Sequence, residues 1–174
     1  MEITASLLKC SVMSYFRFKK GYLVCTELKY GKNIADVIVI DDKMGEVIEI
    51  EVKISKSDLL KELTHKESKH RLLIEAELMN LDSPEPVVCP HKFYFAVPLY
   101  LVDEARKLCL ALNKDYGVIG IDTENKHAQP EYAFFYKRQA HKLHEGQIGY
   151  WFKSALIKRV CNDNIVFHKK AYWT

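Results

Sequence analysis

The stretch that decides the fold is IADVIVIDDKMGEVIEIEVKISKSD, residues Ile34–Asp58. It contains an apolar run, Ile34–Ile40, and a second run, Val47–Ile54, in which apolar and charged residues alternate. β-branched residues and a period of two are typical of strands, and the Asp-Asp-Lys-Met-Gly segment between the runs is typical of a turn. The stretch therefore predicts two neighbouring antiparallel strands.

The second of these strands should present two different faces, because successive side chains of a strand point to opposite sides of the sheet. One face carries Ile48, Ile50 and Val52, and the other carries Glu49, Glu51 and Lys53. Ser55, followed three residues later by Asp58, has the form of a capping box. We therefore expect a helix directly after the strand, over Ser57–Ala76.

The rest of the chain predicts further helices and strands around this pair. Helices are expected at Ser6–Lys19, Val102–Leu112 and Gln147–Val160, strands at Tyr22–Tyr30, Phe93–Val97, Gly117–Ile121 and Tyr132–Tyr136, and a proline-containing loop at Asn80–Pro90. The order strand, helix, strand over residues 93–121 indicates a parallel crossover. The expected fold class is α/β, with a mixed central sheet flanked by helices, formed by a single domain over residues 1–174.

Composition restricts the class of protein. Hydrophobic residues make up 48% of the chain and charged residues 28%, which is typical of a globular protein and not of a disordered one. The sequence lacks an apolar run of about 18 residues and a secretory pattern at its start, so we expect no membrane partner and a cytoplasmic location. The formal net charge of +3 is too small to indicate or exclude a nucleic-acid partner.

The five cysteines are an odd number, widely spread along the chain: Cys10, Cys25, Cys89, Cys109 and Cys161. This pattern favours free thiols over disulfides. A zinc site that begins at Cys89 and His91, with Cys161 or His168 as a distant ligand, is the alternative, but the usual paired ligand spacing is missing.

Three residues of the deciding stretch suggest chemistry. Asp36 interrupts an apolar strand, where a carboxylate is costly unless it is paired or binds a metal. Glu51 and Lys53 lie on one face of the next strand, about 6–7 Å apart along the backbone. Two carboxylates and one backbone carbonyl, that of Val52, are ligands of the kind that Mg²⁺ prefers. Glu-x-Lys occurs four times in the chain, but only residues 51–53 lie in an apolar strand.

A simpler interpretation of the same residues stays open. Glu49, Glu51 and Lys53 are equally compatible with a half-exposed strand whose outer face carries solvated charges in cross-strand pairs. The residues alone do not decide between the two interpretations.

The order of these residues resembles the core of the PD-(D/E)XK nucleases: Ala35-Asp36, then Glu51-Val52-Lys53, then a helix that begins at Ser55 to Asp58. More narrowly, Ile50–Asp58, Lys92–Pro98 and Tyr116–Ile119 resemble the MmcB-like DNA-repair nucleases and their phage-encoded relatives. The resemblance covers roughly Leu7 to Leu143, and Ala35 stands where the superfamily name has proline.

This resemblance implies a restriction-endonuclease-like core and a metal-dependent DNA endonuclease that acts in repair, recombination or phage DNA processing. Asp36, Glu51 and the carbonyl of Val52 would bind Mg²⁺, with Mn²⁺ as a substitute, and Lys53 would be catalytic. Glu27 is expected as an extra metal ligand, since several branches of the superfamily take an acid from the first helix or strand. Its alternative is an exposed carboxylate paired with Lys29 or Lys32.

The expected helix after Lys53 supplies further candidates. Lys66, Lys69 and His70 fall at helical spacing and so share one face. Family members often direct a polar or basic residue from this helix to the active site, so Lys69 and His70 are expected as catalytic residues. The alternative is a solvated basic face.

Basic residues along the chain are candidates for phosphate contacts, and we expect DNA binding by Lys56, Lys66, Lys69, Arg138 and Lys142. A catalytically silent DNA-binding or scaffolding module of the same fold is the main alternative function. RNA as the substrate and a homodimer as the assembly are both left open by the sequence.

Overall fold

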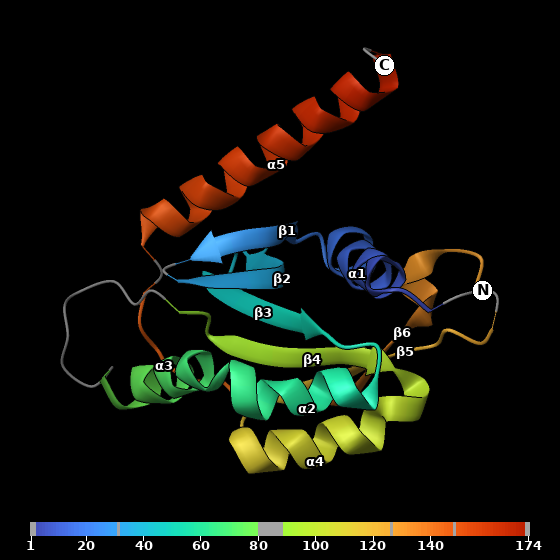
Figure 1. The fold of residues 1–174 in the computed structure, drawn as a ribbon. Helices are drawn as coiled ribbons and strands as arrows, with labels where there is room; N and C mark the ends of the chain where they lie inside the picture. Colours follow the sequence, from blue (N-terminus) through green and yellow to red (C-terminus); the bar gives the residue numbers. More distant parts are fainter. Residues whose placement is uncertain (1–2, 31, 80–88, 126, 148, 173–174) are drawn as a thin grey trace.

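The computed structural model describes residues 3–30, 32–79, 89–125, 127–147 and 149–172. A six-stranded mixed sheet runs through it in the order β1-β2-β3-β4-β5-β6 (Figure 1). The strands are β1 Leu23–Tyr30, β2 Asn33–Asp41, β3 Glu46–Val52, β4 Lys92–Pro98, β5 Gly117–Ile121 and β6 Phe134–Arg138. β1, β2 and β3 pair antiparallel, β3, β4 and β5 pair parallel, and β6 pairs antiparallel with β5.

Helices flank the sheet on both faces (Figure 1). One face is covered by α1, Ala5–Ser14, which continues as the π-helical segment η1, Tyr15–Lys19. The other face is covered by α2 Lys56–His65, α3 Glu67–Met79 and α4 Val102–Leu112. Two short 3₁₀ segments, η2 Leu99–Leu101 and η3 Pro130–Ala133, precede α4 and β6, and α5 Tyr150–Tyr172 packs against β1.

The two faces of the sheet form separate apolar clusters. Under α1, the side chains of Val37, Val39, Ile48, Ile50 and Val52 pack with those of Leu8, Val12 and Phe16. Under α2 and α4, the side chains of Phe93, Phe95 and Val97 pack with those of Leu59 and Ala105. Burial of each such side chain contributes about 1.5–3 kcal/mol, so these clusters fix α1 and α2 on opposite sides of β3.

Several expectations from the sequence are confirmed. The fold is α/β with a mixed sheet flanked by helices, which is consistent with a restriction-endonuclease-like core. Residues 92–121 form the expected parallel crossover. Ser55 caps α2, because its side-chain oxygen accepts a hydrogen bond from the Asp58 amide at 3.2 Å.

The single helix expected over Ser57–Ala76 is wrong, because the chain leaves helical geometry at Lys66, with φ −123° and ψ 21°. The Lys66 carbonyl accepts hydrogen bonds from the amides of Lys69 and His70, at 3.0 and 3.1 Å, and so starts α3. The interruption reorients the chain, and the side chains of Lys69 and His70 are buried.

Three other boundaries differ from the expectations. The strand expected at Tyr132–Tyr136 begins at Phe134, after η3. The last helix begins at Tyr150 rather than Gln147 and continues to Tyr172, beyond the expected end at Val160. Its second half is almost wholly exposed, so no apolar periodicity marks it in the sequence.

Residues 80–88 of the expected loop lie outside the described residues. Within the described parts of the chain, no helix is long and apolar enough to cross a membrane.

Candidate active site

The charged face of β3 is buried. The exposed fraction is 0% for Glu49, 2% for Glu51 and 6% for Lys53. The interpretation of these residues as solvated surface charges is therefore wrong, because α2 and α3 cover this face of the strand. Buried charges are costly unless each is paired and hydrogen-bonded.

Lysines from three places in the chain pair with these acids: Lys53 directly after β3, Lys66 between α2 and α3, and Lys69 in α3. Glu51 Oε1 contacts Lys53 Nζ at 3.1 Å and also Lys66 Nζ, while its Oε2 contacts Lys69 Nζ at 2.7 Å. Lys69 Nζ also lies 2.5 Å from Glu49 Oε1. The other oxygen of Glu49 accepts a hydrogen bond from the Tyr30 hydroxyl. Burial alone would raise the pKa of Glu51, but the ammonium groups of Lys69, Lys53 and Lys66 outweigh it and lower the pKa to about 2.

Glu62 extends the network from α2. Its Oε1 lies 2.6 Å from Lys53 Nζ, and its Oε2 pairs with His70 Nε2 at 3.0 Å. The other ring nitrogen of His70 lies 3.1 Å from the Tyr116 hydroxyl. Lys53 therefore lies between two carboxylates, and His70 reaches it only through Glu62. The interpretation of Lys69 and His70 as a solvated basic face is wrong, since each is only 3% exposed.

Glu62 was not among the candidate residues predicted from the sequence. A signal for it exists, because Glu62 lies four residues after Asp58 and thus on the same face of α2. Asp58 Oδ1 is 3.9 Å from Lys53 Nζ, so this helical face is the one turned to the strand.

Asp36 joins the site from the neighbouring strand. The β2–β3 pairing ends at Val37 and Ile50, and Asp36 Oδ2 then accepts a hydrogen bond from the Val52 amide at 2.9 Å. The Asp36 carboxylate, instead of a backbone carbonyl, thus accepts the hydrogen bond of the Val52 amide, which lies between Glu51 and Lys53. This contact places the Asp36 carboxylate beside the backbone of the segment that bears Glu51 and Lys53.

Lys9 of α1 pairs with two of the candidate metal ligands, Asp36 and Glu27. Its Nζ lies 2.9 Å from Asp36 Oδ1 and also pairs with Glu27. Burial lowers the pKa of Lys9, but its contacts with Glu27 and Asp36 outweigh burial and raise it above the ordinary value. Glu27 is exposed, as in the alternative interpretation, but its partner is Lys9 and not Lys29 or Lys32. The sequence gives no signal for Lys9, because the contact joins residues 18 apart on different elements.

The fit of these residues to a divalent metal is incomplete. Asp36 and Glu27 converge on one cationic atom, Lys9 Nζ, and offer the hard oxygen donors that Mg²⁺ prefers. Glu51 is instead engaged by three ammonium groups. Among the described residues, no three Asp, Glu, His or Cys side chains gather in a group able to hold a metal.

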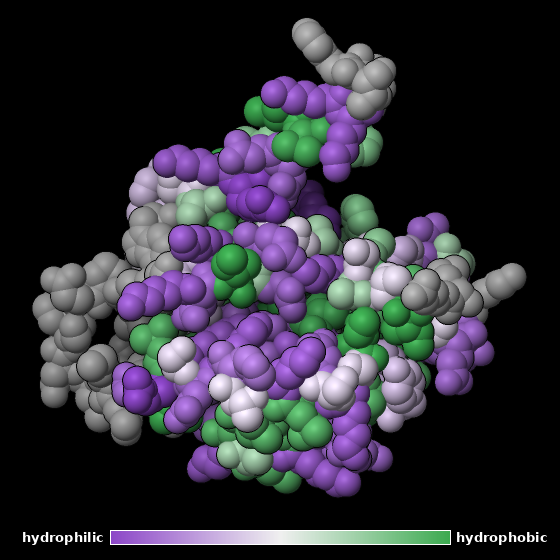
Figure 2. Space-filling model, in the orientation of Figure 1, coloured by the Kyte–Doolittle hydropathy of each residue, from purple (hydrophilic) through white to green (hydrophobic). Residues whose placement is uncertain are grey.

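The expected DNA-binding residues do not form one surface. Lys69 is buried, so it is not available to a phosphate on the outside of this structure. Lys56 is exposed beside Glu104, and Lys66 is partly exposed at the network. Arg138 donates hydrogen bonds to the carbonyls of Tyr116 and Lys114, and Lys142 pairs with Glu46 and Glu145. Figure 2 shows mainly hydrophilic side chains over the middle of the face between α2 and β1.

The cysteines are free thiols, as the sequence suggests. His91, the first candidate partner of Cys89, uses both ring nitrogens within the fold. Its Nδ1 accepts from the Val47 amide at 3.0 Å, and its Nε2 bonds to the Gly146 carbonyl at 2.8 Å. These bonds leave no ring nitrogen of His91 for zinc.

The fold and the site together define an α/β protein with a buried network of acids and lysines on the third strand of a mixed sheet. No known family profile matches the sequence. No curated protein matches it either. A solved structure of a protein of unknown function from Silicibacter pomeroyi is similar, with a TM-score of 0.61 and 16% sequence identity over 97% of this chain and 92% of that chain. At that identity the similarity shows a shared fold alone.

Because of this network, we expect the folded protein to lose stability at acid pH. Glu51 has a folded-state pKa of about 2 against an ordinary 4.5, so its contribution is fully present above about pH 4.5 and is lost as the pH falls towards 2. We expect the free energy of unfolding to fall by roughly 3 kcal/mol across this window. Urea unfolding in chelator at several pH values measures it.

Glu51→Gln should remove much of this pH dependence, since the titrating group is gone. The matched control is Glu124→Gln, because Glu124 is exposed and the loss of its charge should leave the profile unchanged. A wild-type stability that stays constant down to about pH 3 would contradict the expectation.

Proposed function

We propose that this protein is a metal-dependent DNA endonuclease that hydrolyses phosphodiester bonds in repair, recombination or phage DNA processing. The observation that carries the proposal is the hydrogen bond from the Val52 amide to Asp36, which joins Asp36 to the strand segment that bears Glu51 and Lys53. The burial of that segment adds support, because apolar side chains in place of buried ion pairs often leave a fold equally or more stable, so these charges need another reason to be there.

Mg²⁺, or Mn²⁺ in its place, would be held by Asp36, Glu51, the Val52 carbonyl and Glu27. When bound, the metal lowers the pKa of a water and neutralises charge on the phosphate. Two of these ligands, Asp36 and Glu27, already share one cation, the Lys9 ammonium. Binding there therefore requires Lys9 to give up its two partners.

The lysines have different roles in this proposal. Lys53, between Glu51 and Glu62, is the catalytic residue, because a lysine held by carboxylates keeps its proton and can stabilise negative charge that develops on the phosphate. Since Lys53 is only 6% exposed, a phosphate reaches its ammonium only when the network around Glu51 opens. Lys69 and His70 are positioning residues. Lys69 neutralises Glu49 and Glu51, and His70 orients Glu62.

DNA is the proposed partner, and its phosphates would first meet Lys66, which borders the network on the outside, and Lys56, which is exposed on α2 beside Glu104. Arg138 and Lys142 remain proposed phosphate contacts on a separate part of the surface. A cytoplasmic location and a homodimer accompany the proposal as expectations.

The second candidate function is a DNA-binding or scaffolding module without turnover. One observation favours it, since each candidate carboxylate already contacts at least one lysine, although Asp36 and Glu27 share the same one. Such a protein would bind DNA equally well with magnesium and with chelator, and would not cut it.

The test of the proposed function is cleavage of plasmid DNA by purified protein, with magnesium and with chelator. We expect cleavage that needs the metal, and Asp36→Asn should remove that cleavage, because the amide keeps one ligand oxygen but loses the charge that holds the metal. The matched control is Asp42→Asn, at an exposed turn position. Wild-type protein that binds plasmid and leaves it intact at every metal concentration would support the module instead.

A further inference from the structure

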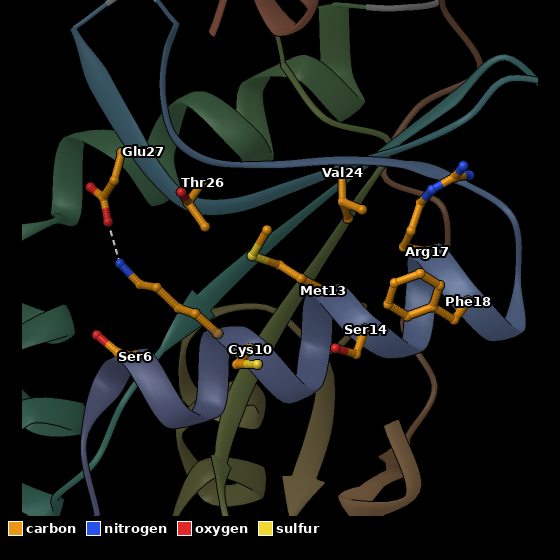
Figure 3. Close-up of a pocket in the computed structure, with 10 residues that line it drawn as sticks. Ser6, Cys10, Met13, Ser14, Arg17, Phe18, Val24, Thr26 and Glu27 are labelled. Atoms are coloured by element: carbon orange, nitrogen blue, oxygen red, sulfur yellow. Dashed lines mark hydrogen bonds and ion pairs between the residues drawn. The ribbon is translucent and has the colours of Figure 1, made fainter. Parts of the chain in front are cut away.

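A cavity of about 590 Å³ lies between the first helix and the first strand. Figure 3 shows Met13 and Val24 facing each other across it, with Arg17 and Phe18 at one end and Glu27 on the strand side. Its lining combines apolar side chains, such as Met13, Phe18 and Val24, with the two cations Lys9 and Arg17.

This cavity adjoins one part of the candidate metal site. Lys9 and Glu27 line it, and the same Lys9 ammonium contacts Asp36 at 2.9 Å. A molecule that filled the cavity would therefore touch Lys9 and Glu27, beside the proposed metal ligand Asp36. The cavity lies on the α1 face of the sheet, and Asp36 links it to the strand segment that bears Glu51 and Lys53, because its other oxygen accepts the Val52 amide.

The backbone on both walls is unusual. Residues Tyr15–Lys19 are π-helical. π-Helical geometry is rare in proteins, and where it occurs it is often part of a functional site. Glu27 has φ 53°, in the left-handed region that non-glycine residues seldom adopt. The side chain of Phe18 is 72% exposed, although a phenylalanine in water contributes little to folding. These features coincide at one cavity.

We propose that this cavity binds an unpaired base of the DNA strand next to the scissile phosphate, so that the substrate is DNA with a single-stranded or branched segment. This inference rests on the proposed function. A base has two apolar faces that stack on an aromatic ring, and Phe18 offers such a ring at the mouth of the cavity. Arg17, in the same lining, carries the charge that a neighbouring phosphate requires.

Paired bases are excluded from this role. In a duplex, both faces of a base are covered by its neighbours, so a base enters a cavity only after it has left the stack. The cavity therefore selects strands whose bases are already free, while the lysines near β3 contact phosphates of any DNA.

The test compares Phe18→Ala with Phe135→Ala, an exposed phenylalanine on β6 at the opposite edge of the sheet. Fluorescence anisotropy in chelator measures the affinity for a labelled single strand, for the duplex, and for a strand of equal length without bases. Phe18→Ala should weaken single-strand binding by roughly 5- to 100-fold and leave duplex binding unchanged. Phe135→Ala should change neither.

The strand without bases provides the second measurement. Wild-type protein should bind the strand without bases as weakly as Phe18→Ala binds the normal single strand. Phe18→Ala should not lower the affinity for the strand without bases any further. The inference is overturned if Phe18→Ala affects neither probe or both equally. If plasmid cleavage with magnesium persists in that case, the cavity assignment alone fails, whereas wild-type protein that neither binds nor cuts any DNA refutes the proposed function as well.

Discussion

Replacement of Lys53 by methionine is expected to lower the single-turnover rate of DNA cleavage by about 10²–10³-fold. The ammonium of Lys53 lies between Glu51 and Glu62, at 3.1 and 2.6 Å, and is only 6% exposed. Methionine fills a similar volume but offers neither a charge nor a hydrogen-bond donor. A contact that acts only on charge developing in the transition state affects the rate far more than it affects binding of DNA.

The effect of a substitution on magnesium affinity distinguishes the role of Lys53 from that of the acidic ligands. A protonated lysine has no lone pair to donate, so Lys53→Met should bind magnesium as well as the wild type does, or slightly better. Titration calorimetry with DNA present measures this, and thermal unfolding checks that the variant folds. The matched control is Lys61→Met, on the exposed side of α2. A cleavage rate within a few-fold of the wild type, or complete loss of metal binding, would show that Lys53 is structural.

Local patterns predicted the parts of the fold that depend on neighbours in the sequence. The alternation over β3 indicated which side chains share a face, and Ser55 indicated where α2 begins, because both features are set within a few residues. The parallel crossover followed in the same way from the order of the apolar segments.

The burial of the charged face of β3 was not predictable from the strand itself. Alternation distinguishes two faces but does not say whether a charged face meets water or another layer. Here α2 and α3 form the second layer, and the helix break at Lys66 between them turns Lys69 and His70 inward. Residues 67–70 keep a helical sequence pattern through the break, so a continuous helix was the natural expectation.

The lysine partners of the acids were only partly predictable. Lys53 and Lys69 stood out because they belong to the strand or to the next helix. Lys9 did not, since its contacts with Glu27 and Asp36 span the chain and depend on how α1 packs over the sheet. Long-range ion pairs carry no local pattern, and for that reason the network had to be observed in the folded chain.

Lys69→Met is expected to lower the free energy of unfolding by about 3–5 kcal/mol. Lys69 is only 3% exposed, and its ammonium contacts Glu49 at 2.5 Å and Glu51 at 2.7 Å. Burial lowers the pKa of Lys69, but the two carboxylates outweigh burial and raise it, so the group is charged in the folded protein. Its removal leaves Glu49 buried without a cation, and this cost is a large fraction of the roughly 5–15 kcal/mol that stabilises a typical domain.

The double variant Lys69→Met with Glu49→Gln tests whether the cost comes from the charge left behind. Glutamine keeps an acceptor for the Tyr30 hydroxyl and has no charge to bury, so the double variant should recover part of the lost stability. Urea unfolding measures the free energy of unfolding of both variants. If this free energy falls with urea concentration at the same slope in both, their unfolded states are alike. Lys61→Met should unfold like the wild type, because Lys61 is exposed. Should Lys69→Met prove as stable as the control, the acids of β3 are not held by Lys69, and the proposed division between a catalytic Lys53 and a positioning Lys69 loses its physical basis.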